Sequence, residues 1–222
     1  MFRFLRSTSA RCAGVMLLLT LLLTALAPAT IAAPPLPSQL TQWGGGQQRS
    51  TPTPTRARPT PTAAPSAGYA FPVRPAAKAR YGRYHHDYPA ADIFCPIGSA
   101  FVAPTDGVVD YVSAVDLWKP STDKPADRGG IAVAIVGSDG VRYYGSHLSS
   151  VAKGIEPGVR VRVGQLLGYT GKSGNARRTE PHVHFGISHP TTPDDWQVRR
   201  GEVAPYDYLK AWQRGDSVTP KL

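Results

Sequence analysis

The chain has 222 residues and a formal net charge of +10, which allows one domain with attachments but excludes two full-sized domains behind a leader. A basic chain suits a polyanionic partner, and here the basic residues are scattered rather than gathered in one patch. Of the two cysteines, Cys12 lies near the N-terminus and Cys95 is alone in the rest of the chain. No internal disulfide is therefore expected after removal of a leader, and Cys95 is predicted to be a small buried hydrophobe.

Residues 1–33 are typical of a secretory signal peptide. Three arginines precede an apolar run over residues 15–27, which is short for a membrane span of about 20 residues. Small residues permit cleavage after Ala29 or Ala32; an uncleaved N-terminal anchor is the alternative. In either case we predict export, and removal of the three leader arginines leaves a net charge of +7. Export argues against nucleic acid and favours a polyanionic surface outside the membrane.

Residues 34–68 predict a disordered linker. They are rich in Pro, Thr, Ser and Gly and nearly empty of large apolar residues, so they cannot bury enough surface to offset the entropy lost on ordering. We expect an extended, partly polyproline tether. The folded unit is expected over residues 69–213, with a flexible tail over residues 214–222.

The folded unit consists of short β-branched runs separated by turn residues, which predicts a mainly β domain. Helix is scarce, and only residues 205–213 have a helical pattern, with Pro205 at the start. We predict a compact antiparallel, sandwich-like sheet whose long loops wall a groove, with one short C-terminal helix. The expected strands cover residues 108–115, residues 131–136 and 141–147 about the turn Asp139-Gly140, a further pair around Gly164-Gln165, and residues 182–188.

The last predicted strand, HVHFGIS, carries two histidines on one face. Side chains alternate with period two, so His182 and His184 point one way while Val183 and Phe185 point the other. Imidazoles on one face, a histidine in an earlier strand and the upstream stretch RYHHDYPAADIF supply the ligand types of a zinc site. A catalytic zinc site needs neutral imidazoles and a carboxylate, and it keeps one position open for water.

Five motifs then occur in a fixed order: HHDYPAAD, APTDGVV, YGSHLSS, GVRVRVGQLLGYTGKSG and PHVHF. In this order they resemble the zinc peptidoglycan endopeptidases of the lysostaphin and LytM type. That family carries His-x-Gly-x-Asp, an Ala-x-Gly-Val turn, Tyr-x-His-Leu, a Gly-rich strand pair and Pro-His-Leu-His-Phe. The resemblance spans about residues 80–188 and implies a zinc metallopeptidase domain.

The resemblance implies Asp92 and His184 as zinc ligands, with the third ligand from the early histidine pair. It also implies that His147 and His182 are catalytic histidines that do not bind the metal. The family usually separates its first histidine and its aspartate by four positions, whereas His86 precedes Asp92 by six and His85 by seven. We expect His86 to be the ligand, with His85 as the alternative and a bulge absorbing the two extra residues.

The expected chemistry follows from these positions. Two imidazoles and one carboxylate leave Zn²⁺ positively charged, so it can polarise an amide carbonyl and lower the pKa of its water from ~15.7 towards ~7. His182 shares the ligand's face and can bind that water or the oxyanion. His147 can hold the attacking water or protonate the leaving amine.

Several nearby residues have simpler interpretations. Asp87 either pairs with Arg83 or supports a ligand histidine. The three tryptophans of the folded unit are expected to pack in the domain rather than to bind sugars. They are Trp118, Trp196 and Trp212.

The sequence thus predicts a secreted, cell-wall-associated zinc metalloendopeptidase that hydrolyses peptide bonds in the stem peptides or cross-bridges of bacterial peptidoglycan. The expected partners are wall peptides and not nucleic acid, with membrane contact only through an uncleaved N-terminus, and the expected state is a monomer. Two alternatives remain: an inactive wall-binding or activator module of the same fold, and a zinc peptidase acting on a protein.

Overall fold

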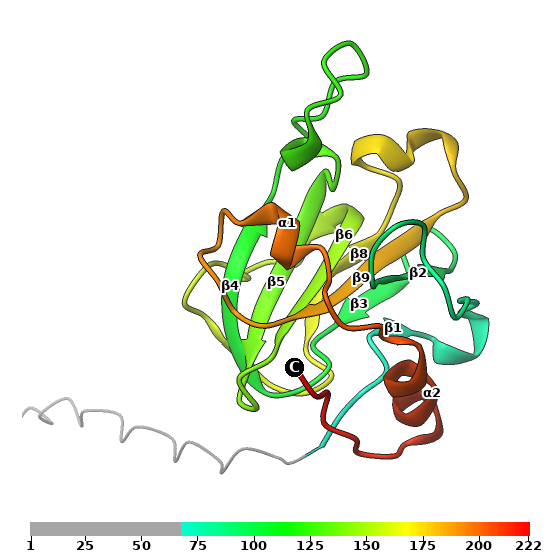
Figure 1. Cartoon of the computed structure of the whole chain (residues 1–222), viewed down its shortest axis with the longest axis vertical. Coiled ribbons are helices and arrows are strands. Elements are labelled where there is room, and N and C mark those ends of the chain that lie inside the picture. Colours follow the sequence, from blue (N-terminus) through cyan, green and yellow to red (C-terminus); the bar gives the residue numbers. More distant parts are fainter. Residues whose placement is uncertain (1–67) are drawn as a thin grey trace, which may run out of the picture. The chain divides into compact units, whose positions relative to one another are not determined.

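A computed structural model of the chain describes residues 68–222 (Figure 1). The predicted signal peptide and nearly all of the predicted linker lie outside the described residues. Among the helices of residues 68–222, none has the length and apolar character needed to cross a membrane.

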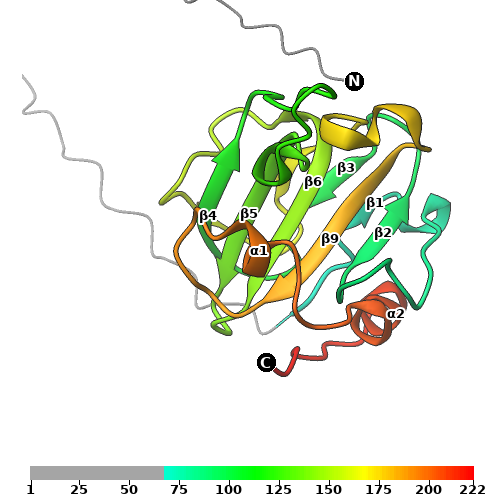
Figure 2. The ribbon, with the colours of Figure 1, turned by 45° about the horizontal axis from the view of Figure 1, so that its top comes forward.

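The described chain is built on one antiparallel sheet of nine strands, which confirms the mainly β prediction. The strands are hydrogen-bonded in the order β1-β3-β8-β6-β5-β4-β7, while β9 pairs with both β6 and β2. In Figure 2, β6, β9 and β2 lie side by side, with the helix α1 in front of β6 and β9. The strands are β1 (Val73–Arg74), β2 (Ala91–Phe94), β3 (Ala100–Val102), β4 (Gly107–Ser113), β5 (Ile131–Gly137), β6 (Arg142–Val151), β7 (Arg160–Val161), β8 (Leu166–Thr170) and β9 (His182–Ser188).

Two short α-helices follow the sheet: α1 (Trp196–Arg199) and α2 (Tyr206–Arg214). The predicted C-terminal helix is confirmed: Pro205 precedes its first turn, and Gly215 ends it in the left-handed conformation, with φ of 91°. Three short 3₁₀ turns complete the helical content of the described residues: Ala76–Lys78, Pro125–Asp127 and Gly174–Arg178.

The hairpin of β5 and β6 forms as the sequence predicts. Gly140 has φ of 78°, which its lack of a Cβ permits, and the Asp139 carboxylate accepts a hydrogen bond from the Val141 amide at 3.0 Å. The same carboxylate accepts the hydroxyl hydrogens of Tyr69 and Tyr143 at 2.6 and 2.5 Å. This turn therefore fastens the first described residues to the sheet.

The two strands around Gly164-Gln165 also form, but the expectation that they pair with each other is wrong. β7 pairs with β4, whereas β8 pairs with β3 and β6. Gly164, with φ of 75°, and the hydrogen bond from the Gln165 amide to the Arg162 carbonyl turn the chain between the two strands. β7 has only two residues, and the turn after it leads to β8 at another place in the sheet rather than forming a hairpin.

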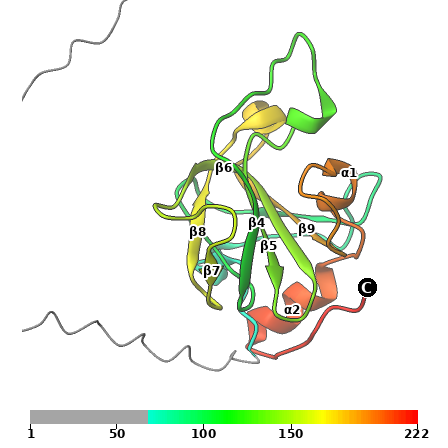
Figure 3. The same cartoon turned by 90° about the vertical axis from the view of Figure 1, so that its left-hand side faces the viewer.

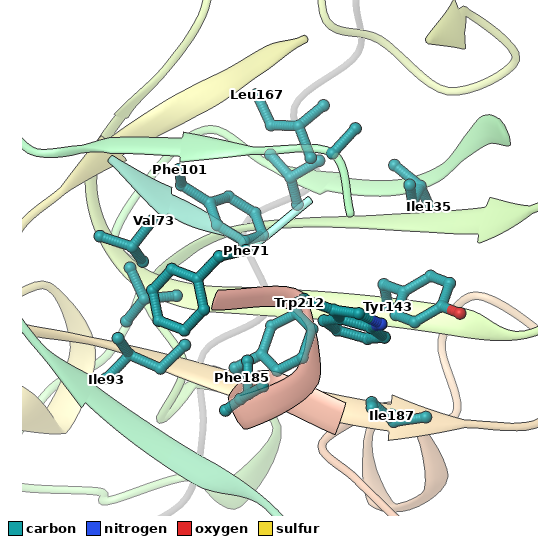
Figure 4. Close-up of a cluster of buried hydrophobic side chains, with 14 of the residues drawn as sticks. Phe71, Val73, Ile93, Phe101, Ile135, Tyr143, Leu167, Phe185, Ile187 and Trp212 are labelled. Atoms are coloured by element: carbon teal, nitrogen blue, oxygen red, sulfur yellow. The ribbon is translucent and has the colours of Figure 1, made fainter. Parts of the chain in front are cut away.

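The main hydrophobic cluster includes the side chains of Val183, Phe185 and Ile187 on one face of β9, and Figure 4 shows part of it. The Trp212 indole of α2 lies 6.0 Å from the Tyr143 ring of β6 and 6.3 Å from the Phe185 ring of β9, and it stacks on Tyr69 at 5.2 Å between ring centroids. Trp212 therefore packs as expected. Cys95 is also buried as predicted and lies against Thr170, with its sulfur 3.3 Å from the hydroxyl oxygen.

A β-bulge interrupts the pairing of β5 with β6. Ile131 lies opposite Leu148 and Val133 opposite Gly145, so Ser146 and His147 together face a single residue of β5. His147 has φ of 61°, a left-handed conformation that is uncommon for residues other than glycine. Bulges of this kind redirect a side chain and are frequent beside active sites.

The connection between β4 and β5, residues 114–130, stands out from one end of the sheet (Figure 3). It is held by contacts near its base: Arg128 pairs with Asp123 at 2.6 Å, and Arg177 pairs with Asp116 at 2.9 Å. The Trp118 indole donates a hydrogen bond to Asp123 at 2.9 Å. The loop therefore forms one wall of the groove that the sequence predicts.

Candidate functional site

The polar face of β9 carries the candidate site. In the antiparallel register Asp92 of β2 lies opposite His184, and Phe94 lies opposite His182. On the other side of β9, Ser146 of β6 also lies opposite His184. Directly opposite residues share a sheet face, so strand pairing alone brings Asp92 and His184 together.

His184 is held on both ring nitrogens. Its Nε2–H donates to the Arg200 carbonyl at 2.9 Å, and its Nδ1 lies 3.0 Å from Asp92 Oδ1. Burial would raise the pKa of the Asp92 carboxyl, but the hydrogen bond from His184 and the nearby charges of His184, His182 and His85 bring it down to about 2. Asp92 is therefore a carboxylate at neutral pH.

The early histidines both lie near Asp92 but in different surroundings. His85, His86 and Asp92 each place one ligand atom within 4.8 Å of the other two. The His85 side chain is 6% exposed, and its Nε2 lies 3.6 Å from Asp92 Oδ1. Burial and the charge of His184 lower the pKa of His85 to about 4, and its Nδ1 has no hydrogen-bond partner. His86 is exposed. The chain thus offers a neutral, buried imidazole at His85 and a more accessible one at His86.

His147 enters the site from the bulge of β6. Its ring centroid lies 4.9 Å from that of His182 and 6.1 Å from that of His184. Its Nδ1–H donates to the Ser173 carbonyl at 2.9 Å, which leaves Nε2 as the free ring nitrogen. Burial, with the charges of His184 and His182, lowers the pKa of His147 to about 3. At neutral pH its Nε2 therefore carries a lone pair.

His182 of β9 is oriented by a backbone carbonyl in the same way as His147. Its Nδ1–H donates to the Glu180 carbonyl at 2.8 Å, and its Nε2 lies 3.9 Å from Asp92 Oδ1. The ring packs against Phe94, with 5.3 Å between ring centroids. His182 thus presents Nε2 to the same space as His147.

All five predicted residues line one open cavity of about 320 Å³. His85 lines it as well, so the structure brings together every residue that the sequence singles out for the site. The walls come from the segment before β2, from the β4–β5 connection, from the 3₁₀ turn after β8 and from α1. The groove predicted from the long connections is therefore present.

Several lining residues were not predicted from the sequence. Tyr144 precedes Ser146 by two positions on β6 and shares its face, so alternation along the YYGSH stretch could have identified it. Trp196, Arg199 and Arg200 come from α1 and the residue after it, and they carry no periodic or spacing signal. Trp196 was expected to pack in the domain, whereas it is half-buried and lines the cavity.

Asp87 also lines the cavity, and the suggested ion pair between Asp87 and Arg83 is not the one that forms. Arg83 instead pairs with Asp207 of α2, with 3.3 Å between Nη2 and Oδ1. The guanidinium of Arg83 also lies over the Tyr206 ring at 4.3 Å. Arg83 therefore ties the segment before β2 to α2 and leaves Asp87 at the rim.

Asp92 and its histidine neighbours offer the donor types that a zinc ion takes. With metal–ligand distances of about 2.0–2.2 Å in a tetrahedral site, neighbouring ligand atoms stand roughly 3.3 Å apart. Asp92 Oδ1 lies 3.0 Å from His184 Nδ1 and 3.6 Å from His85 Nε2. Because Nε2 of His184 is used in the hydrogen bond to the Arg200 carbonyl, Nδ1 is the ring nitrogen that could bind a metal beside Asp92 Oδ1. The Arg200 carbonyl would fix the orientation of this ligand ring.

The fold and the buried His/Asp cluster define a peptidase. The pattern of peptidase family M23 matches residues 86–196, half of the chain, and the chain belongs to this family. It is 33% identical over 138 residues to the L-Ala–D-Glu endopeptidase of Bacillus subtilis (strain 168). That match covers 60% of this chain and 37% of the relative, so the chain corresponds to just over a third of that protein.

A solved structure supports the fold assignment. A putative glycyl-glycine endopeptidase LytM from Ruminococcus gnavus is similar at 25% identity and a TM-score of 0.51, covering 67% of this chain and 62% of that one. The catalytic domain of lysostaphin from Staphylococcus simulans has 26% identity and a TM-score of 0.43, covering 59% of this chain and 88% of that one. The family match and the similarity to the LytM structure confirm the resemblance that the sequence predicts.

Proposed function

We propose that this M23 peptidase is an exported zinc endopeptidase that hydrolyses amide bonds in the peptides of bacterial peptidoglycan. One observation carries the proposal: Asp92, His184 and the early histidines meet in the same cavity as two further imidazoles, those of His147 and His182. The names of the similar endopeptidases support a wall peptide as substrate. The N-terminal sequence supports export.

Asp92, His184 and one early histidine would hold the zinc ion. We favour His85 over His86 because the His85 side chain is only 6% exposed and its Nε2 lies 3.6 Å from Asp92 Oδ1. When bound, zinc would polarise the scissile carbonyl and lower the pKa of its water from about 15.7 towards about 7. The alternative set is His85, His86 and Asp92, whose ligand atoms all lie within 4.8 Å of one another.

His147 and His182 would move protons in this reaction. His147 donates from Nδ1 to the Ser173 carbonyl, so its Nε2 can take a proton from the attacking water and pass it to the leaving amine. His182 is oriented in the same way by the Glu180 carbonyl, and its Nε2 faces the cavity, where it can hydrogen-bond the oxygen that gains charge. Both rings are fixed through Nδ1, which spares their reorganisation during the reaction.

The test is release of peptides from purified peptidoglycan by the purified chain, followed by mass spectrometry, with zinc content measured on the same samples. Asp92→Ala and His184→Ala should lose both zinc and peptide release. Comparison of His85→Ala with His86→Ala identifies the third ligand. His189→Ala is the matched control, because this histidine is exposed, pairs with Glu202 and lies outside the cavity.

Two results would redirect the proposal. A folded chain that binds peptidoglycan but holds no zinc and releases nothing would indicate a wall-binding or activator module. A zinc-containing chain that cleaves a protein but no wall peptide would indicate a peptidase with a protein substrate.

A further inference from the structure

We propose that Arg200, assisted by Arg199, forms a carboxylate-binding subsite beside the candidate metal site. The preferred substrate is then a peptide with a free carboxyl group within a few residues of the scissile bond. This inference rests on the proposed peptide hydrolysis and adds the charge of the substrate to it.

Arg200 is coupled to the site through its backbone. Its carbonyl accepts the Nε2–H of His184 at 2.9 Å, and its side chain lines the cavity. The Tyr88 ring lies 5.8 Å from the His184 ring, and the Arg200 guanidinium lies 3.8 Å from the Tyr88 ring. The guanidinium is therefore within about 10 Å of His184, a span that an extended peptide covers in roughly three residues.

The Arg200 guanidinium is held in place but not hydrogen-bonded. It lies over the Tyr88 ring at 3.8 Å and 5.2 Å from the Trp196 ring. Stacking uses the planar face of a guanidinium and leaves its edge of N–H donors free for a bidentate carboxylate. Within residues 68–222, no carboxylate oxygen lies within 4.0 Å of Arg200; the arginine ion pairs there involve Arg80, Arg83, Arg128, Arg142, Arg177 and Arg214.

Arg199 lines the same cavity and adds a second positive charge. It is 4% exposed, its guanidinium lies 3.7 Å from the Tyr111 ring, and it donates from Nη1 to the Pro193 carbonyl. Its Nε is buried without a hydrogen-bond partner. Among the described residues no carboxylate oxygen lies within 4.0 Å of Arg199, and its nearest acidic interaction is with the exposed Asp194. A bound anion would therefore add to the stabilisation of this buried charge.

The remaining charges of the cavity do not cancel these two arginines. Arg128 is already paired with Asp123 at 2.6 Å. Of the two lining acids, Asp92 is a candidate metal ligand, which leaves Asp87 at the exposed rim. The cavity therefore holds an excess of positive charge on the side of α1, and a substrate carboxylate complements it.

The test uses the full chain and two forms of one peptide fraction. Muropeptides from digested peptidoglycan are used with free carboxyl groups, or after conversion of these groups to primary amides. kcat/KM and the dissociation constant are measured for both forms with the unmodified chain, Arg200→Gln and Arg200→Lys. Arg160→Gln is the charge-matched control, because Arg160 is exposed on β7, outside the cavity.

The unmodified chain should prefer the free-carboxyl form by about 10- to 100-fold in kcat/KM, the usual effect of a hydrogen-bonded charge pair. Arg200→Gln should lose that factor on the free-carboxyl form and change kcat/KM for the amidated form far less. Arg200→Lys should keep part of the preference, and Arg160→Gln all of it. Equal activity on both forms, or an equal loss on both in Arg200→Gln, would overturn the proposal.

Absence of hydrolysis for both forms would count against the proposed function, and the dissociation constants then decide on the subsite. Tighter binding of the free-carboxyl form that disappears in Arg200→Gln supports it. Equal dissociation constants for the two forms refute it.

Discussion

The two faces of β9 are equally buried but have opposite neighbours. Val183, Phe185 and Ile187 point into the hydrophobic cluster of Figure 4, whereas His182 and His184 point into the cavity. Both sets are at most a few per cent exposed. Burial alone therefore does not distinguish packing residues from functional ones. Hydrogen bonds do distinguish them. Each histidine of β9 has at least one hydrogen-bond partner, whereas the side chains of the apolar face carry no polar atom that needs one.

The pairing and packing of β9 hold the side chains of the site in place. β9 is paired along both edges, with β2 and β6, and its apolar face is covered by side chains including Trp212 of α2. A strand held in this way fixes the positions of the side chains on its other face. We therefore expect substitutions on the two faces to separate activity from stability.

The largest expected effect is on the cavity face. His184→Ala should lower peptide release at least about 10³-fold, because the several kcal/mol that a metal contributes to the transition state are lost with its ligand. The free energy of unfolding of the metal-free protein should change less than it does for Phe185→Ala. Kinetics on peptidoglycan and urea denaturation measure the two quantities. A metal-free His184→Ala protein less stable than Phe185→Ala would contradict the separation of the faces.

The opposite result is expected on the apolar face. Phe185→Ala should lower the free energy of unfolding by about 3–5 kcal/mol, since it leaves a cavity among fully buried side chains. Phe185→Leu should cost less because it fills part of the space. At a temperature where both remain folded, their zinc content should match that of the unmodified chain. Zinc loss in folded Phe185→Leu would show that the faces are not independent.

A smaller effect on catalysis is expected at the bulge of β6. His147→Asn should lower kcat about 10²–10⁴-fold, the usual range for loss of a general acid or base. Zinc should be retained, because His147 is not a proposed ligand. Asparagine tolerates the left-handed backbone at φ of 61°, so the fold should persist. Loss of zinc from this variant would argue instead that His147 is a ligand.

The smallest predicted effect concerns the Arg200 carbonyl, which accepts the hydrogen bond from the His184 ring. Gly186 lies on the cavity face, and a Cβ there would stand 2.4 Å from the Arg200 carbonyl oxygen. Gly186→Ala should push away the acceptor of His184 and weaken zinc binding about 10- to 100-fold, the usual cost of losing such a partner. Gly68→Ala is the control, since a Cβ at Gly68 meets nothing within 4 Å. Unchanged zinc affinity in Gly186→Ala would rule out this role of the Arg200 carbonyl.

The strands of this fold could be predicted because their signals are local. Alternation placed His182 and His184 on one face, and Asp139-Gly140 marked the hairpin. The bulge at His147 could not be predicted, because one extra residue in a strand depends on the neighbouring strand and leaves no mark in the period-two pattern. The pairing partners of β7 and β8 were missed for the same reason: they depend on distant strands.

The site was predictable where the histidines lie in strands and less so where they lie in a loop. Asp92 and His184 are fixed by register, but the early pair belongs to a segment shaped by contacts with distant residues. His85 packs against Tyr88 and His184, and Tyr88 lies under the Arg200 side chain. No spacing rule contains these contacts, and for that reason the sequence alone could not decide between His86 and His85.

The most direct test of the account is the zinc content of the purified chain beside His184→Ala and Phe185→Leu, measured by elemental mass spectrometry after dialysis against metal-free buffer. We predict about one zinc per chain in the unmodified protein and in Phe185→Leu, and little or none in His184→Ala. A folded chain without zinc, or a His184→Ala protein that keeps its zinc in full, would contradict the claim that the polar face of β9 builds the metal site.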